Sequence, residues 1–279
     1  MADIEEAPTD RVGFGRAEMF SEPLVGTVKT YNTHVFVCSH QARCVALKLP
    51  SPQALLTPPR NPQSAKEWSH DTTKEATSSH ALLDAALEAA SGEPGAAALG
   101  KPKTTLFAPE GGDRPGDVLL FPANKRLRPA SDMVAQPSAW AAEVVSLLLS
   151  PAAGEALPVG TAHVFVCAHA RRDKRCGVCG PALIDSLRAG AESRGKAAAV
   201  VVRACSHVGG HAYAGNVLVF APRAGGGDIV GDWFGYVVPG DVDALLDTRI
   251  AGGAIIPKLW RGCMGMTPEQ CTAACAGCV

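Results

Sequence analysis

The amino-acid sequence predicts an α/β protein built from two tandem copies of one domain. The segment THVFVCSH at 33–40 recurs almost unchanged as AHVFVCAH at 162–169. The blocks EGGD (110–113) and GDVLLF (116–121) recur as VGGH (208–211) and GNVLVF (215–220), with one residue fewer between the blocks in the first copy. Strand-like apolar runs alternate with helical patterns, as in parallel strand–helix–strand units. The sequence therefore predicts an internal duplication.

The first half, residues 1–150, predicts one such domain with a long insertion. After the strand at 33–38, residues 52–79 are rich in Pro, Ser, Thr and charged residues without an apolar period, which predicts a solvated loop. A helical pattern at 81–87 ends at Gly92. The remaining predicted elements are strands at 104–107 and 118–121, a helix at 140–149 and a linker at 151–154.

The second half, residues 155–262, predicts the same order more completely. Apolar runs at 162–167 and 199–202 are typical of buried parallel strands, and a helical pattern at 182–187 lies between them. Gly180 and Pro181 predict the start of that helix, because proline suits a first helical turn. Strands at 217–220 and 233–238 form a predicted hairpin through 223–228, and a helix follows at 241–247.

Two pairs of metal-type ligands follow the two parallel strands of the second half. Cys167 and Cys176 are separated by eight residues, and His207 and His211 flank two glycines. Adjacent parallel strands place the loops at their carboxyl ends side by side, so we expect the four side chains to converge. Two thiolates with two imidazoles suit zinc or a [2Fe–2S] cluster, and the long cysteine spacing favours the cluster.

The residues around these ligands suggest supporting roles. The charged loop that contains His169, Arg172, Asp173 and Arg175 either orients the site and attracts acidic partners or is simply solvated. Gly209 and Gly210 suit a backbone that passes close to a bound group.

The predicted helix start favours the thiolate of Cys176, because a helix N-terminus is positive. Cys179 completes a Cys-x-x-Cys spacing typical of thiol redox sites, but it fits a structural role as well.

The first copy lacks most of these residues. Pro109 and Asp113 stand where the second copy has His207 and His211, and Leu47 stands at the position of the second cysteine. Cys38 remains, with His40 and Cys44 nearby as a candidate partial site. We therefore expect the first copy to be a degenerate scaffold without cluster ligands.

Composition narrows the class of protein. The net charge is −1, which does not favour nucleic acid as a partner, and no apolar run is long enough for a membrane span. The acidic N-terminus lacks the features of a secretory signal or transit peptide, which predicts a cytoplasmic location. Ten cysteines without an export signal indicate metal or redox chemistry. The tail at 263–279 holds Cys263, Cys271, Cys275 and Cys278, either as a second metal site or as a flexible segment.

Together these motifs resemble the sucrase/ferredoxin-like family over nearly the whole chain. The matching segments are Cys-x8-Cys, His-x-Gly-Gly-His, 169–177, Tyr-Ala-Gly-Asn at 213–216, Trp-Phe-Gly at 233–235 and Trp-Arg-Gly at 260–262. The resemblance implies thioredoxin-like domains and a [2Fe–2S] cluster with two cysteine and two histidine ligands. Carried over, these ligands are Cys167, Cys176, His207 and His211.

The expected function is one-electron transfer between redox donor and acceptor proteins that the sequence does not identify. We expect it to be coupled to proton uptake, because ligand imidazoles near the surface gain proton affinity when the centre is reduced. A thiol–disulfide oxidoreductase using Cys176 and Cys179, and an interaction protein stabilised by zinc, are the alternatives. No paired-carboxylate motif for glycoside hydrolysis is identifiable, so the family name does not predict a hydrolase.

Overall fold

The computed structural model describes residues 13–21, 23–39, 79–224 and 227–277, without the side chain of His211. The candidate partial site at His40 and Cys44 and the predicted loop at 52–79, except Ser79, lie outside the described residues. No helix in the described ranges has both the length and the apolar character needed to cross a membrane.

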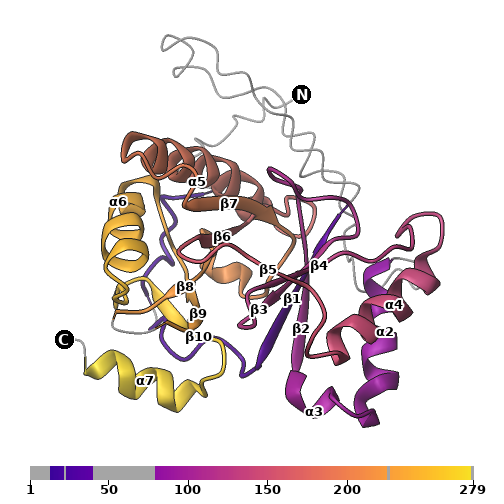
Figure 1. The fold of residues 1–279 in the computed structure, drawn as a ribbon. Helices are drawn as coiled ribbons and strands as arrows, with labels where there is room; N and C mark the ends of the chain where they lie inside the picture. The colour runs from indigo at the N-terminus through magenta and orange to yellow at the C-terminus, as the bar shows by residue number, and fades with distance from the viewer. Residues whose placement is uncertain (1–12, 22, 40–78, 225–226, 278–279) are drawn as a thin grey trace, which may run out of the picture.

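The described chain is a mixed α/β structure around one ten-stranded sheet of order β10-β9-β8-β6-β7-β2-β1-β3-β4-β5 (Figure 1). The strands are β1 Thr33–Cys38, β2 Pro102–Phe107, β3 Val118–Phe121, β4 Lys125–Leu127, β5 Glu155–Ala156, β6 Ala162–Cys167, β7 Val200–Cys205, β8 Val217–Pro222, β9 Ile229–Phe234 and β10 Trp260–Cys263.

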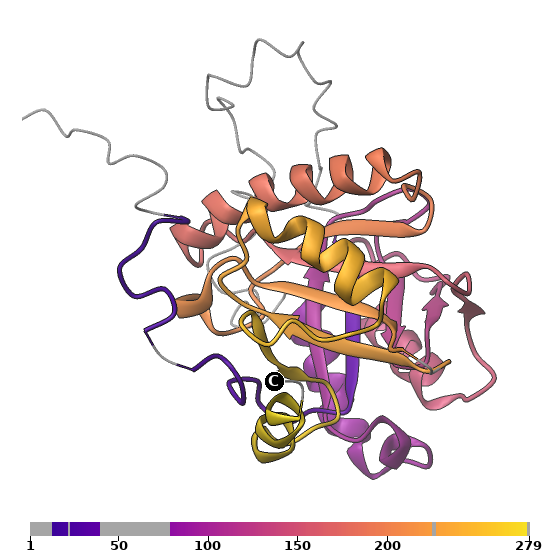
Figure 2. The ribbon, with the colours of Figure 1, turned by 90° about the vertical axis from the view of Figure 1, so that its left-hand side faces the viewer.

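Helices cover the sheet in both halves. The α-helices are α2 Ser79–Ala89, α3 Ala96–Leu99, α4 Pro137–Leu149, α5 Lys174–Ser193, α6 Val242–Ala244 and α7 Pro268–Ala276. Short 3₁₀ turns lie at Ala90–Gly92 (η2), His211–Tyr213 (η3) and Pro239–Asp241 (η4), and a π-helix at Leu245–Ala251 (η5). In Figures 1 and 2, α5 and α6 lie over the second half, and α2 and α4 lie beside the first.

The two halves pair their strands in the same way. β1 is parallel to β2 and antiparallel to β3, and β6 is parallel to β7 and antiparallel to β8. The predicted strand–helix–strand unit of the second half is thus confirmed, with Cys167 opposite Cys205 at the carboxyl ends of β6 and β7. The division into domains at 1–150 and 155–262 stays a prediction.

One short antiparallel contact joins the halves within the sheet. β2 and β7 overlap only at their carboxyl ends, where Phe107 lies opposite Cys205. Beyond that pair, Ala108 N–H donates to Ala204 O at 2.9 Å and Ser206 N–H donates to Leu106 O at 2.8 Å. The loops that follow β2 and β7 therefore meet at the centre of the molecule.

An aromatic core fills the space between the halves. Phe36 of β1 stacks on Phe165 of β6 with ring centroids 3.7 Å apart, and Phe121 stacks on Phe220 at 4.3 Å. In a flat sheet β1 and β6 would be about 14 Å apart, because neighbouring strands are spaced by about 4.8 Å. The sheet therefore bends so that the inner faces of its two halves oppose each other. Each stacked pair joins equivalent positions of the repeated segments.

Two predictions about local structure need correction. α5 begins at Lys174 rather than at Gly180–Pro181, because Asp173 caps it by accepting from Arg175 N–H at 2.9 Å. Pro181 lies inside this helix and offers no N–H to the carbonyl of Gly177.

The second strand of the hairpin is Ile229–Phe234 rather than 233–238. It pairs with β8 from Ile229 opposite Pro222 to Phe234 opposite Val217, and the chain then leaves the sheet at Tyr236, whose φ is 56°. The C-terminal tail, for which we left a flexible segment open, contains the helix α7, capped by Thr267. Cys278 lies outside the described residues.

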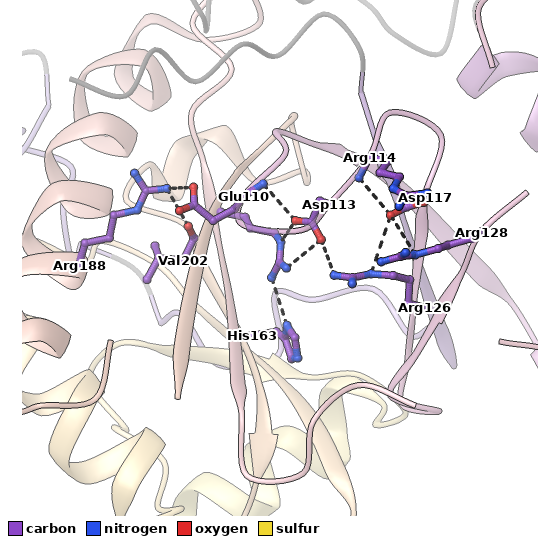
Figure 3. Close-up of polar contacts among 10 residues, drawn as sticks. Glu110, Asp113, Arg114, Asp117, Arg126, Arg128, His163, Arg188 and Val202 are labelled. Atoms are coloured by element: carbon purple, nitrogen blue, oxygen red, sulfur yellow. Dashed lines mark hydrogen bonds and ion pairs between the residues drawn. The ribbon is translucent and has the colours of Figure 1, made fainter. Parts of the chain in front are cut away.

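A buried ion network links the halves on the side of the first copy (Figure 3). The carboxylate of Asp113 is fully buried and accepts from Arg203 of β7 at 2.7 and 3.1 Å and from Arg126 of β4 at 2.6 Å. Arg203 also lies 3.1 Å from His163 Nδ1. Burial and then Arg203 lower the pKa of His163 to about 3, so that this imidazole is neutral.

We predict that Arg203→Met destabilises the whole protein by roughly 3–5 kcal/mol, because it removes one of the two cations that compensate the buried carboxylate of Asp113. Urea denaturation followed by circular dichroism measures this change. Arg194→Met is the matched control, since Arg194 pairs with the exposed carboxylates of Asp243 and Asp247. Its effect should be much smaller, and equal effects of the two variants would contradict the prediction.

Candidate metal centre

Three of the four predicted ligands converge. The sulfurs of Cys167 and Cys176 and a ring nitrogen of His207 all lie within 4.8 Å of one another. Cys167 ends β6, Cys176 lies in the first turn of α5, and His207 follows the end of β7. Both cysteines are buried, and His207 is half-buried. The fourth predicted ligand, His211, begins the η3 turn, but its side chain lies outside the described residues.

Glycines let α5 approach the end of β6 closely enough to bring the two cysteines together. A Cβ atom on Gly177 would lie 2.4 Å from the Cβ of Ala170, and one on Gly180 would lie 2.6 Å from the carbonyl oxygen of Cys167. No side chain fits at either position without displacing backbone. The first two turns of α5 therefore pack directly on the loop that follows Cys167.

The pKa values of the two sulfurs shift in opposite directions. Hydrogen bonds from Cys176 and then His207 lower the pKa of Cys167 well below its usual value despite burial, and the backbone N–H of His169 also donates to it. The Cys176 thiol has a raised pKa, because it gives its proton to the Cys167 hydrogen bond and is buried. The first thiolate of the site is therefore Cys167, although Cys176 lies at the positive end of α5 as predicted.

Cys179 and Cys205 do not behave as activated thiols. Burial raises the pKa of Cys179 to about 11, and burial followed by the charge of Cys167 raises the pKa of Cys205. Both side chains are fully buried. This arrangement does not favour a reactive Cys176–Cys179 pair.

The residues predicted to support the site have distinct positions. His169 is buried, and its Nδ1 accepts from His207 N–H at 3.3 Å. Asp173 caps α5 and binds the Arg175 side chain at 2.9 and 3.0 Å. Arg172 is exposed. We call residues 207–214 the histidine loop. Gly209 and Gly210 both have positive φ, at 93° and 68°, so this loop needs glycine at these positions.

The sequence did not predict a role at the site for Arg261 or Asn216. Arg261 is buried, and its guanidinium donates to Asn216 Oδ1 at 2.6 Å, while Asn216 Nδ2 donates to Gly210 O at 3.1 Å. A Cβ on Gly210 would lie 2.4 Å from the Arg261 guanidinium. Both residues belong to segments that carry the family resemblance, Tyr-Ala-Gly-Asn and Trp-Arg-Gly, and this was the available signal.

The equivalent region of the first half has different chemistry. Cys38 is fully buried, and burial followed by the charges of Asp113 and Asp117 raises its pKa. Asp113 forms ion pairs with Arg203 and Arg126. Within the described ranges, Cys167, Cys176 and His207 form the one group of three or more metal-type donors, so Cys263, Cys271 and Cys275 do not form another.

A model of the sucrase/ferredoxin-like family matches residues 24–262. "Altered inheritance of mitochondria protein 32" of Debaryomyces hansenii is 40% identical over 104 residues, which cover 37% of this chain and 36% of that protein. The protein of the same name from Meyerozyma guilliermondii is 42% identical over 99 residues, covering 36% of this chain and 33% of that protein. The matches thus span about a third of these relatives.

Among solved structures, a thioredoxin-like [2Fe–2S] ferredoxin from Aquifex aeolicus is 19% identical, with a TM-score of 0.32. The similarity covers 39% of this chain and 96% of the ferredoxin.

We predict that metal-free protein binds Cd²⁺ through Cys167 and Cys176 but not through Cys179. Cys176→Ser should abolish most of the ultraviolet sulfur-to-cadmium absorption, because it removes one of two adjacent thiolates. Cys179→Ser, one turn further along α5, is the matched control and should leave the titration nearly unchanged. The opposite ranking of the two variants would favour a site formed by the Cys-x-x-Cys pair.

Proposed function

This chain belongs to the sucrase/ferredoxin-like family, and we propose that it is an electron-transfer protein with a [2Fe–2S] centre. The proposed ligands are Cys167, Cys176, His207 and His211. The observation that carries the proposal is the convergence of two buried sulfurs and a half-buried imidazole within 4.8 Å at the ends of two adjacent parallel strands.

The donor set fits the proposed centre. Thiolates are soft ligands that select iron–sulfur clusters and zinc, and two histidines replace two cysteines on one iron in some [2Fe–2S] proteins. Bound at this position, the centre would supply one-electron redox chemistry.

The chain itself would supply the rest of the proposed site. Cys167 and Cys176 would hold its buried side, and the histidine loop its more exposed side. A Cβ on Gly209 would meet nothing within 4 Å, so space is open beside that loop.

Exposed cations adjoin the proposed ligands and support acidic redox proteins as donor or acceptor. Three exposed cations precede Cys176 in the chain. Arg171 and Arg172 lie in the loop before α5, and Lys174 is the first residue of that helix. Cationic surfaces accelerate encounter with partners of opposite charge.

We also infer that the two halves arose by duplication. Phe36 stacks on its counterpart Phe165, and Phe121 stacks on its counterpart Phe220. Contacts between equivalent residues are the pattern of a two-fold symmetric interface between identical units. In this interpretation the first half keeps the packing of such a pair and has replaced its ligands by the ion pairs of Asp113.

A second candidate function is structural zinc binding by the same residues. The three converging donors support zinc binding as well as a cluster, because zinc accepts cysteine and histidine ligands in a tetrahedral site. A thiol–disulfide oxidoreductase based on Cys176 and Cys179 is less well supported, since the pKa of both thiols is raised.

An anaerobic spectrum of the purified protein distinguishes these functions. We expect visible absorption, about two iron and two sulfide ions per chain, and an electron-spin signal after reduction. Cys167→Ser should lose all three. Cys38→Ser changes the equivalent cysteine of the first half and should retain them. Zinc without iron in the wild type would contradict the proposal, as would retention of the cluster by Cys167→Ser.

We further propose that electron uptake is coupled to proton uptake at the ligand imidazoles. Added negative charge raises the proton affinity of a nearby imidazole nitrogen that solvent can reach. The reduction potential should therefore fall with rising pH, with a slope that approaches roughly 59 mV per pH unit for one proton per electron. Protein-film voltammetry measures it. A potential that stays flat from about pH 6 to 10 would exclude exposed histidine ligands.

A further inference from the structure

The described residues that precede β1 contact the second half of the chain. We call residues 13–21 and 23–31 the N-terminal strap. Gly26 N–H donates to Arg261 O at 2.9 Å, and Gly265 N–H donates to Tyr31 O at 2.8 Å. Figure 2 shows this indigo segment passing beside one end of α5 and the η3 turn. The strap therefore lies next to the candidate metal centre, although it is far from it in sequence.

Arg16 anchors the strap to the histidine loop. Its guanidinium donates to Ala212 O at 3.4 Å and to Ala214 O at 3.1 Å, one and three residues after His211. The side chain is buried and lies over the ring of Tyr236, 5.5 Å from its centroid. Because Arg16 binds both carbonyls, it fixes the path of the η3 turn.

Thr27 anchors the strap to the same loop from a second direction. Arg261 donates to Thr27 Oγ1 at 3.0 Å and to Thr27 O at 3.3 Å. The same guanidinium binds Asn216, which holds the carbonyl of Gly210. One buried cation thus connects the strap with the backbone between His207 and His211.

A weaker contact reaches the cysteine side of the site. Glu18 lies 3.5 Å from the guanidinium of Arg175, which Asp173 also binds. Arg175 immediately precedes Cys176. Because the Glu18 side chain is half exposed, we assign this pair little energy.

We propose that the N-terminal strap is a clamp for the candidate metal centre, with Arg16 and Arg261 as its positioning residues. The histidine loop contains two glycines with positive φ, and such a loop loses much conformational freedom when it becomes ordered. Contacts from outside the loop offset this cost by holding its backbone in place. The strap supplies them through Arg16 directly and through Thr27 and Arg261.

Arg261 also places a positive charge beside the site. Burial lowers the pKa of Arg261 to about 10, while Tyr213 and the Cys167 thiolate act in the opposite direction, so the guanidinium remains charged at neutral pH. A buried cation favours any added negative charge nearby. This second role rests on the proposed function, whereas the clamp itself acts in metal-free protein as well.

The first experiment tests the clamp without a bound centre. Full-length, metal-free wild type, Arg16→Ala and Arg16→Lys are compared by amide hydrogen exchange. Exchange at residues 207–214 should be about tenfold faster or more in Arg16→Ala, because charged hydrogen bonds to two carbonyls are lost. Arg16→Lys keeps the charge and should restore part of the protection. Arg194→Ala changes an arginine of the same half that pairs with exposed carboxylates, and it should change nothing in this loop.

The second experiment uses protein that carries the centre. Loss of iron to a chelator should be about ten- to a hundredfold faster in Arg16→Ala than in wild type, as for other residues that orient ligands. Arg261→Gln removes the buried charge and should lower the reduction potential, whereas Arg194→Gln should not.

The outcomes separate the two proposals. Wild type without iron would overturn the proposed function, while hydrogen exchange would still decide on the clamp. Equal exchange at 207–214 in wild type and Arg16→Ala would overturn the clamp. Faster exchange throughout the sheet of Arg16→Ala would also overturn it, because the effect would then be global unfolding. If Arg261→Gln does not fold, the Arg16→Lys rescue still tests the clamp.

Discussion

The contact of β2 with β7 at their carboxyl ends determines where the candidate metal centre and the ion network of Asp113 lie. In α/β sheets the loops at the carboxyl ends of parallel strands carry the functional groups. Here each half has one parallel pair, and the halves meet end to end at Phe107 and Cys205. Both sets of loops therefore face the interface between the halves. The candidate metal centre lies in one set, and the ion network of Asp113 lies in the other.

The two sets of loops show two solutions to one physical problem. A loop buried at an interface must compensate its polar groups, because an isolated buried charge is costly. In the second half, thiols and imidazole compensate one another as mutual hydrogen-bond partners. In the first half, Asp113 occupies the position equivalent to His211, and Arg203 from the other half supplies the opposite charge. Where the second half has His211, the first half thus has a carboxylate that binds the other half.

The sequence predicted what depends on local pattern and missed what depends on distant contacts. Repeated strands and paired ligands are visible as short motifs, so the strand–helix–strand unit and the convergence of Cys167, Cys176 and His207 could be predicted. The predicted start of α5 was wrong because it was placed at Pro181, whereas the helix begins after the N-cap residue Asp173. Arg16 and Thr27 bind groups about two hundred residues away, which no periodicity reveals.

The candidate metal centre combines two neighbouring sulfurs with a buried cation. Two neighbouring thiolates would repel each other, but the pKa of Cys167 is lowered and that of Cys176 is raised, which favours a single negative charge on the pair. The buried guanidinium of Arg261 lies near enough to act on that charge. A metal that bound both sulfurs would have to displace the proton of Cys176, because a cysteine ligates a metal as its thiolate.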